Sequence, residues 1–275
     1  MNCYNEIYII LEKIKEKTPL VHHITNYVTA NDCANIVLAL GGSPVMADDP
    51  KEVEEMVSIA SALVLNTGTL NERTIESFII AGKKANKLGI PVILDPVGVG
   101  ATNLRNKTVE KILKEVKLSV LRGNMSEIKN IYGLNSLTKG VDSTDNPLNG
   151  GKEISISLAK QLNCIVAITG SVDIISDGKK VFYIKNGHEI LSKITGTGCM
   201  SSSLIGLCCG TGKSPLYGAI AGIMIMGIAG EKANKRLKNF EGLGSFKVYL
   251  LDAVSTFSKN DIKERGNLCE ILWKY

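Results

Sequence analysis

Short runs of apolar residues recur along the chain, separated by longer amphipathic stretches. Each run is four or five residues long and rich in β-branched side chains, which is typical of strands covered on both faces. Because strand-like and helix-like segments alternate, the pattern predicts an α/β fold with a mainly parallel sheet between helices. The runs lie at residues 62–65, 91–94, 118–121 and 164–168.

The clearest helix is predicted over residues 71–88. Its apolar and small residues fall on one stripe at helical spacing, and lysines lie on the opposite face. Gly89 ends this helix, and Pro91 opens the next strand. The stripe consists of Ile75, Phe78, Ile79, Gly82 and Ala85.

Residues 173–184 interrupt the alternation. Two strand-like runs flank Asp177 and Gly178, a pair typical of the tight turn between antiparallel strands. We therefore expect an antiparallel hairpin near the C-terminal half of the sheet.

Composition narrows the class of protein. No linker or repeat divides the 275 residues, so we interpret residues 1–275 as a single domain. The formal charge is +5, but lysines alternate with glutamates and form no basic patch, which argues against a nucleic-acid partner. The seven cysteines include no CxxC pair, which argues against a disulfide framework or a structural zinc.

One segment resembles a membrane span. Residues 214–230 are uncharged and mostly apolar, but these 17 residues include four glycines and a proline. We interpret the segment as a helix buried inside a large α/β domain. The N-terminus also lacks the apolar core of a signal peptide. We therefore expect a cytoplasmic protein with no membrane partner.

The ends of the predicted strands are polar and rich in glycine. Ligands of parallel α/β sheets bind beyond the carboxyl ends of the strands. These ends are therefore expected to form a site. Their sequences are NTG at residues 66–68, DPVG at 95–98, RGNMSE at 122–127 and TGS at 169–171.

The segment ITGTGCMSSSL at residues 194–204 carries the sharpest signal. Gly196 and Gly198 allow a tight turn that presents backbone N–H groups at a helix N-terminus, where an anion is favoured. Cys199 then lies in the first helical turn, where the helix dipole is expected to lower the pKa of its thiol. Taken alone, the pattern also fits a glycine turn followed by a packing cysteine.

Charged residues at the neighbouring strand ends favour an anion site over a simple glycine turn. Asp95 and Glu127 are placed to converge on Mg²⁺, which binds a few carboxylates together with waters and phosphate oxygens. Asn124 precedes Glu127 by three residues and faces the same side, while Arg122 can fork onto phosphate oxygens. Taken one at a time, Asp95 also fits a turn before proline and Glu127 an acid at a helix N-terminus. Together these residues indicate a nucleotide-phosphate site.

The motifs together resemble the hydroxyethylthiazole kinase family of the ribokinase-like superfamily, over most of the chain. The resemblance implies a three-layer α/β/α ribokinase-like fold and ATP-dependent phosphorylation of the hydroxyl of 4-methyl-5-(2-hydroxyethyl)thiazole, a thiamine-salvage step. Cys199 lies where the wider superfamily has an aspartate that acts as the base. A cysteine at this position points to the thiazole kinase branch. The shared motifs are PLVHHITN at residues 19–26, ALGGSPVMA at 39–47, TGTGC at 195–199 and the strand ends NTG, LDPVG and RGNMSE.

The resemblance also implies a role for individual residues. Arg122 and Thr169 would contact the phosphates of ATP, and Asn124 belongs to the same signature. Asp95 and Glu127 would organise Mg²⁺ through waters.

On the acceptor side, the resemblance implies that Met46 and the backbone of Gly196 contact the thiazole, with Asn26 close by. Cys199 would lie beside the reacting hydroxyl. It further implies a homotrimer with substrate sites at subunit interfaces.

Some residues depart from the family pattern. His23, Met125 and the serines at 201–203 flank motifs, so they bear on substrate preference more than on reaction type. His22 and His23 are adjacent in an extended segment and point in opposite directions, so we interpret them as structural or interface residues.

Three other functions stay open. Cys199 as a covalent nucleophile would need a basic partner within hydrogen-bond reach. A non-catalytic nucleotide-binding subunit would not need two carboxylates and an arginine together. A kinase for another vitamin-precursor alcohol, such as hydroxymethylpyrimidine or pyridoxal, would use the same chemistry.

Overall fold

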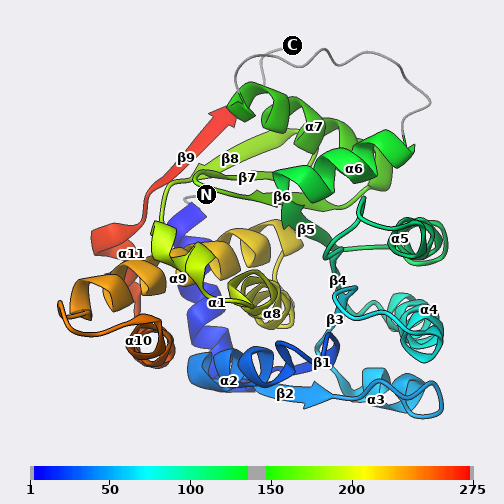
Figure 1. Cartoon of the computed structure of the whole chain (residues 1–275), viewed down its shortest axis with the longest axis horizontal. Helices are drawn as coiled ribbons and strands as arrows, with labels where there is room; N and C mark the ends of the chain where they lie inside the picture. Colours follow the sequence, from blue (N-terminus) through cyan, green and yellow to red (C-terminus); the bar gives the residue numbers. More distant parts are fainter. Residues whose placement is uncertain (1–2, 136–146, 273–275) are drawn as a thin grey trace.

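A computed structural model describes residues 3–135 and 147–272 of the chain, which form a nine-stranded sheet between two layers of helices (Figure 1). The strand order is β2-β1-β3-β4-β5-β6-β7-β8-β9, parallel as far as β6 and antiparallel beyond it. The predicted fold class is thus confirmed. The strands are β1 (Leu20–Ile24), β2 (Ser43–Met46), β3 (Ala62–Asn66), β4 (Val92–Asp95), β5 (Val120–Asn124), β6 (Ile165–Thr169), β7 (Asp173–Ser176), β8 (Lys180–Ile184) and β9 (Leu268–Leu272).

Helices cover both faces of the sheet (Figure 1). Each face buries its own apolar cluster against its helices, which is the arrangement that continuous apolar strands require. One layer contains α3 (Val53–Ile59), α4 (Glu72–Leu88), α5 (Asn103–Glu115), α6 (Met125–Asn135) and α7 (Pro147–Leu162). The other contains α1 (Cys3–Lys17), α2 (Ala30–Leu40), the 3₁₀ helix η1 (Glu189–Lys193), α8 (Thr197–Cys209), α9 (Pro215–Arg236), α10 (Leu243–Ser255) and α11 (Lys259–Arg265).

The four predicted apolar runs correspond to β3, β4, β5 and β6. The third run, predicted at residues 118–121, begins two residues before β5, which spans Val120–Asn124. Arg122 and Asn124 therefore lie on the strand itself, and the Arg122 side chain projects from the sheet. The predicted hairpin is confirmed as β7 and β8, which pair antiparallel.

The helix α4 shows how local sequence sets an element's ends. Asn71 caps its N-terminus and forms reciprocal hydrogen bonds with Thr74, which satisfy backbone groups that a helix start leaves free. Gly89 ends it in the left-handed conformation, with φ of 70°. Along the predicted stripe, Phe78 and Ala85 are fully buried.

Helix α9 is the segment that resembled a membrane span. Of the described helices it is the one long and apolar enough to cross a bilayer, and 83% of its most apolar window is buried inside the protein. It packs against α1, α8, α10 and the sheet. The expectation of a buried core helix is therefore met.

Candidate active site

Four parallel strands end with a polar residue at one edge of the sheet. Asn66 ends β3 and is paired in register with Asp95, the last residue of β4. Asn124 ends β5 and is paired with Thr169, the last residue of β6. Since parallel strands share one carboxyl edge, these side chains meet the loops that follow them, as the sequence predicted.

The glycine loop ends at the N-terminus of α8, which lies over β3 and β4. Gly196 caps the helix in the left-handed conformation, with φ of 90°. A Cβ there would lie 2.8 Å from Cγ2 of Thr29, so both the conformation and the space require glycine. At Gly198 a Cβ would lie 2.7 Å from Nη1 of Arg122. The free N–H groups of the helix thus lie beside a guanidinium, and this combination of donors favours an anion.

Cys199 lies in the first turn of α8 between two asparagine side chains. Asn26 Nδ2 approaches its Sγ at 3.5 Å, and Asn66 Nδ2 approaches it at 3.2 Å. The expectation of a lowered pKa for this thiol is wrong. Burial raises the pKa of Cys199, and the nearby carboxylate of Asp95 raises it further. Desolvation and a like charge therefore outweigh the hydrogen bonds from Asn66 and Asn26, which lower the pKa of this thiol.

Asp95 is fully buried at the end of β4. Its Oδ2 accepts hydrogen bonds from Ser202 Oγ at 2.9 Å and Asn66 Nδ2 at 3.1 Å. Its Oδ1 lies 3.6 Å from Nη1 of Arg122, close enough for an ion pair but too far for a hydrogen bond. Burial raises the pKa of Asp95, and the charge of Arg122 offsets only part of that rise.

Glu127 and Asn124 form a reciprocal pair at the start of α6. Asn124 Oδ1 accepts from the Glu127 N–H at 2.9 Å, and Glu127 Oε2 accepts from the Asn124 N–H at 2.8 Å. Oε1 of Glu127 accepts from the N–H of Gly98 at 3.0 Å. The glutamate therefore ties the loop after β4 to the end of β5, a role that the sequence did not reveal.

The donor set suits Mg²⁺ only in part. In the described ranges, no group of three or more His, Cys, Asp or Glu side chains could hold a metal ion. Glu127 bonds Gly98, three residues beyond Asp95, and its charge raises the pKa of Asp95. Asp95 Oδ1 is buried without a hydrogen-bond partner. Such a set fits an ion that takes most of its ligands from water and phosphate.

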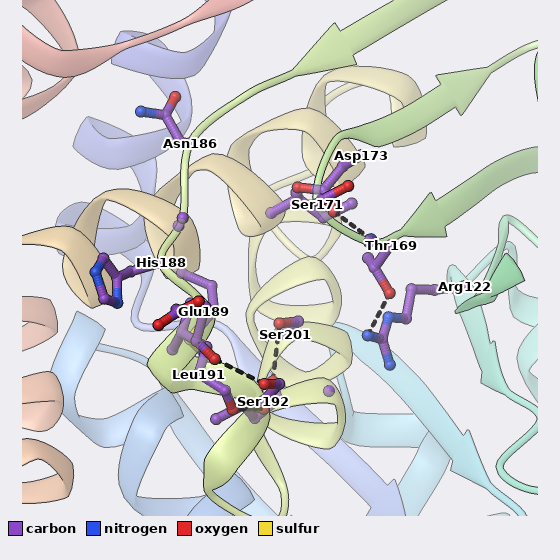
Figure 2. Close-up of a pocket in the computed structure, with 17 residues that line it drawn as sticks. Arg122, Thr169, Ser171, Asp173, Asn186, His188, Glu189, Leu191, Ser192 and Ser201 are labelled. Carbon is purple, nitrogen blue, oxygen red and sulfur yellow. Dashed lines mark hydrogen bonds between the residues drawn. The ribbon is translucent and has the colours of Figure 1, made fainter. Parts of the chain in front are cut away.

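A cavity of about 560 Å³ opens between the end of β6, the N-terminus of α8 and the segment before η1 (Figure 2). Arg122 lines it and donates from Nη2 to Thr169 Oγ1 at 2.6 Å. Thr197, Gly198 and Ser201 contribute the wall on α8. The volume suits a small-molecule ligand or cofactor.

The other predicted residues lie outside this cavity. Asn26 is buried beside Cys199 and Asn66, with its Nδ2 2.9 Å from Oδ1 of Asn66. Met46 ends the edge strand β2 opposite His23 and is 38% exposed. The structure thus brings Asn26, Asp95 and Arg122 to the α8 N-terminus, and leaves Met46 on an exposed edge.

The two histidines face opposite sides of β1, as predicted. His22 Nε2 hydrogen-bonds the carbonyl of Ala47 at 2.8 Å, while His23 Nε2 hydrogen-bonds Ser203 Oγ at 3.0 Å. Burial lowers the pKa of both, that of His23 to about 4, so both rings are uncharged at neutral pH.

Sequence reasoning missed Arg105 and Ser202. Arg105, from α5, donates to the carbonyls of Thr67, Gly68 and Val97 and so clamps the loops after β3 and β4. An isolated arginine on an amphipathic helix gives no signal of this role. Ser202 was noted only as an unusually polar residue, although it bonds Asp95.

Comparison with solved structures defines the class. The Staphylococcus aureus pyridoxal kinase in complex with AMP-PCP and pyridoxal has this fold at 15% identity and a TM-score of 0.60, covering 92% of this chain and 97% of that one. The chain therefore has the three-layer α/β/α fold of the ribokinase-like kinases.

More similar proteins define the family. The hydroxyethylthiazole kinase family model matches residues 11–260, and the chain belongs to this family. It is 75% identical to the hydroxyethylthiazole kinase of Alkaliphilus oremlandii over 98% of this chain and 100% of that protein. The hydroxyethylthiazole kinase of Clostridium beijerinckii is 54% identical, over 97% of this chain and 99% of that one. The solved structure of the Pyrococcus horikoshii protein is 38% identical with a TM-score of 0.89, covering 97% and 99% of the two chains.

Proposed function

We propose that this chain is a hydroxyethylthiazole kinase, which transfers the terminal phosphoryl group of ATP to the hydroxyl of 4-methyl-5-(2-hydroxyethyl)thiazole. The observation that carries the proposal is the position of the α8 N-terminus. On one side it opens to the cavity at Arg122, and on the other it holds Cys199 beside Asn26 and Asn66. One helix end thus lies between a proposed anion site and a cluster of polar side chains around Cys199, so it could position two substrates for phosphoryl transfer.

The cavity would receive ATP. Arg122 and Thr169 would bind its phosphates together with the N–H groups of Gly198 and Cys199, and Asn124 would fix the adjoining strand end. Phosphoryl transfer depends chiefly on positioning and on neutralising charge, which these groups supply. The proximity of Gly198 to Arg122 supports this assignment, because both donors then address the same phosphate.

Asp95 and Glu127 would hold Mg²⁺ through waters. When bound, the ion neutralises charge on the phosphates. The protein's own part is to favour the ionised form of Asp95 against the effect of burial, and Arg122, Ser202 and Asn66 supply the charge and donors that lower its pKa.

The thiazole alcohol would bind on the Cys199 side of α8. Asn26, Met46 and the backbone of Gly196 would contact the ring, and Cys199 would orient the hydroxyl. The raised pKa of Cys199 argues for an orienting thiol and against a thiolate base or nucleophile. A loose transition state needs little help from a base.

The assembly and location are part of the same proposal. The chain would act as one domain, residues 1–275, in the cytoplasm, and as a homotrimer with its substrate sites at subunit interfaces. The exposure of Met46 at the edge strand β2 supports a site completed by a neighbouring subunit.

A coupled assay that follows ADP release tests the function. The thiazole alcohol, hydroxymethylpyrimidine and pyridoxal are compared as acceptors at equal concentration with ATP and Mg²⁺. Turnover is expected with the thiazole alcohol and not, or far more slowly, with the other two. Turnover with only one of the other two alcohols would contradict the proposed substrate but not the kinase activity. No turnover with any acceptor would contradict both the substrate and the kinase activity.

A further inference from the structure

The nucleotide cavity contains a buried carboxyl group that none of the roles above employs. Asp173 begins β7 and lines the cavity at the turn that follows Thr169 (Figure 2). Only 7% of the residue is exposed. Its Oδ1 accepts a hydrogen bond from the N–H of Gly170 at 3.0 Å. Within the described ranges, no hydrogen bond reaches its Oδ2.

The surroundings of Asp173 leave its charge poorly compensated. Burial raises its pKa to about 7, and the Gly170 N–H and the charge of Arg122 offset only part of the rise. The charged or titratable groups on the same cavity wall are Arg122 on β5 and His188 and Glu189 beside η1, while α9 contributes Ile223, Met226 and Gly227.

A nucleotide in this cavity would favour the neutral form of the Asp173 carboxyl over its ionised form. Its phosphates would neutralise Arg122, the cation that partly supports an ionised Asp173, and would add negative charge to the same cavity. An ionised carboxylate there would repel the ligand. A neutral carboxyl instead removes the repulsion and offers an O–H donor to a phosphate or ribose oxygen.

We propose that Asp173 is a further residue of the nucleotide site and that it carries a proton while the nucleotide is bound. The inference rests on the nucleotide binding proposed above. The proton comes from solvent, so binding and protonation are linked. Below pH 7 the carboxyl already holds its proton. As pH rises above 7 it must gain one on binding, so nucleotide affinity falls by up to about tenfold per pH unit.

Isothermal titration calorimetry with ADP tests this linkage without any turnover. ADP and Mg²⁺ are titrated into the wild-type protein and Asp173→Asn at pH 6 and pH 8, each in two buffers of different ionisation enthalpy. Asn keeps an acceptor for Gly170 and a donor for the ligand, but it cannot ionise. The protonation of ADP itself is the same in both titrations and cancels in the comparison.

At pH 8 the wild-type protein is expected to take up as much as one more proton per ADP than Asp173→Asn. Its affinity should fall about tenfold from pH 6 to pH 8 relative to the variant. His188→Gln is the matched control, because it removes a different titratable group from the same cavity wall and should leave the extra proton uptake in place. Asp173→Ala removes both the ionisable group and the acceptor for Gly170. Its comparison with Asp173→Asn therefore separates the effect of the charge from the effect of this hydrogen bond.

A second readout is spectroscopic and compares the wild-type protein with Asp173→Asn. An infrared difference spectrum at pH 8 should show a protonated carboxyl band that grows when ADP is added and is missing in Asp173→Asn. Equal proton uptake by the two proteins, or a band that persists in the variant, would overturn the role of Asp173 and leave the proposed function intact. A folded wild-type protein that binds no ADP would overturn the proposed function, and this inference with it.

Discussion

Asn66 donates a hydrogen bond from Nδ2 to Oδ2 of the buried Asp95, over 3.1 Å. The two residues end neighbouring strands and are paired in register, so the sheet itself sets this contact. The same Nδ2 lies 3.2 Å from Sγ of Cys199, on a helix 133 residues further along the chain. One amide therefore joins the carboxylate and the thiol of the site.

Replacing Asn66 by Ala should weaken catalysis more than binding. Asp95 Oδ1 already lacks a hydrogen bond, and the substitution leaves Oδ2 with Ser202 alone. A lost bond to a buried charged group costs about 1–3 kcal/mol, so kcat should fall roughly 10- to 100-fold. Steady-state kinetics with both substrates measures the change.

Asn35→Ala is the matched control for Asn66→Ala. Asn35 donates to Asn31 on the exposed face of α2, so its loss should leave kcat unchanged. If both variants kept wild-type kcat, the link between Asn66 and Asp95 would have no part in the reaction.

The thiol of Cys199 should react slowly with alkylating reagents. Burial and Asp95 raise its pKa, so little thiolate is present near neutral pH. Iodoacetamide at pH 7.5, followed by mass spectrometry of the peptides, should label the exposed Cys269 well before Cys199. Preferential labelling of Cys199 in the folded protein would show a reactive thiolate and revive the covalent mechanism.

A methyl group at Gly198 should disturb nucleotide binding. Its Cβ would lie 2.7 Å from Nη1 of Arg122, so Gly198→Ala must push the guanidinium away from the helix N-terminus. We expect KM for ATP to rise about tenfold or more, with little change in KM for the acceptor.

Gly244→Ala provides the comparison for Gly198→Ala. It lies in the first turn of α10, where an added Cβ meets nothing within 4 Å. Both variants add one methyl group near a helix start. An unchanged KM for ATP in Gly198→Ala would mean that Arg122 can move aside without loss.

Much of the fold follows from the sequence because the central strands are apolar on both faces. The runs that became β3 and β4 have no other stable position than a covered sheet, and their polar ends then mark the site. β1 escaped recognition because His22 and His23 interrupt its apolar pattern. Ala47 and Ser203 each hydrogen-bond one ring nitrogen of these side chains, and those partners are distant in sequence.

The site was harder to predict where opposing effects had to be compared. The position of Cys199 in the first turn of α8 was correct, but the direction of its pKa shift was not. Sequence reveals a helix dipole, which favours the thiolate. It does not reveal the burial of the thiol or the proximity of Asp95, which both raise the pKa of the thiol.

Arg105 should contribute to both stability and activity. Its guanidinium donates to three carbonyl groups in the loops after β3 and β4, which carry Asn66 and Asp95. The single ammonium group of Arg105→Lys cannot span these acceptors. We expect a loss of about 1–3 kcal/mol in the free energy of unfolding, measured by urea denaturation, together with reduced kcat.

Arg73→Lys tests whether any arginine would behave this way. Arg73 forms an ion pair with Asp48 at the surface, with its side chain 54% exposed, so its replacement should change stability by less than about 0.5 kcal/mol. Equal losses in the two variants would argue against a specific clamp by Arg105.

Asp173→Asn should stabilise the ligand-free protein in a pH-dependent way. The pKa of this carboxyl is 3.8 in its ordinary state and about 7 in the folded protein. Between these values the folded state holds a proton that the unfolded chain has released, so wild-type stability declines as pH rises from about 4 to about 7. The variant lacks this decline, so its advantage should grow across that window and level off above it, reaching at most about 4 kcal/mol.

Thermal unfolding at pH 5, 6, 7 and 8 would reveal the trend, at roughly 2–4 °C for each kcal/mol. Glu189→Gln is the control, since it removes an exposed carboxylate from the same cavity wall and should leave the pH trend of the wild-type protein in place. A constant difference between wild type and Asp173→Asn at every pH would mean that Asp173 is ionised throughout, since only a proton held by the folded state makes the difference vary.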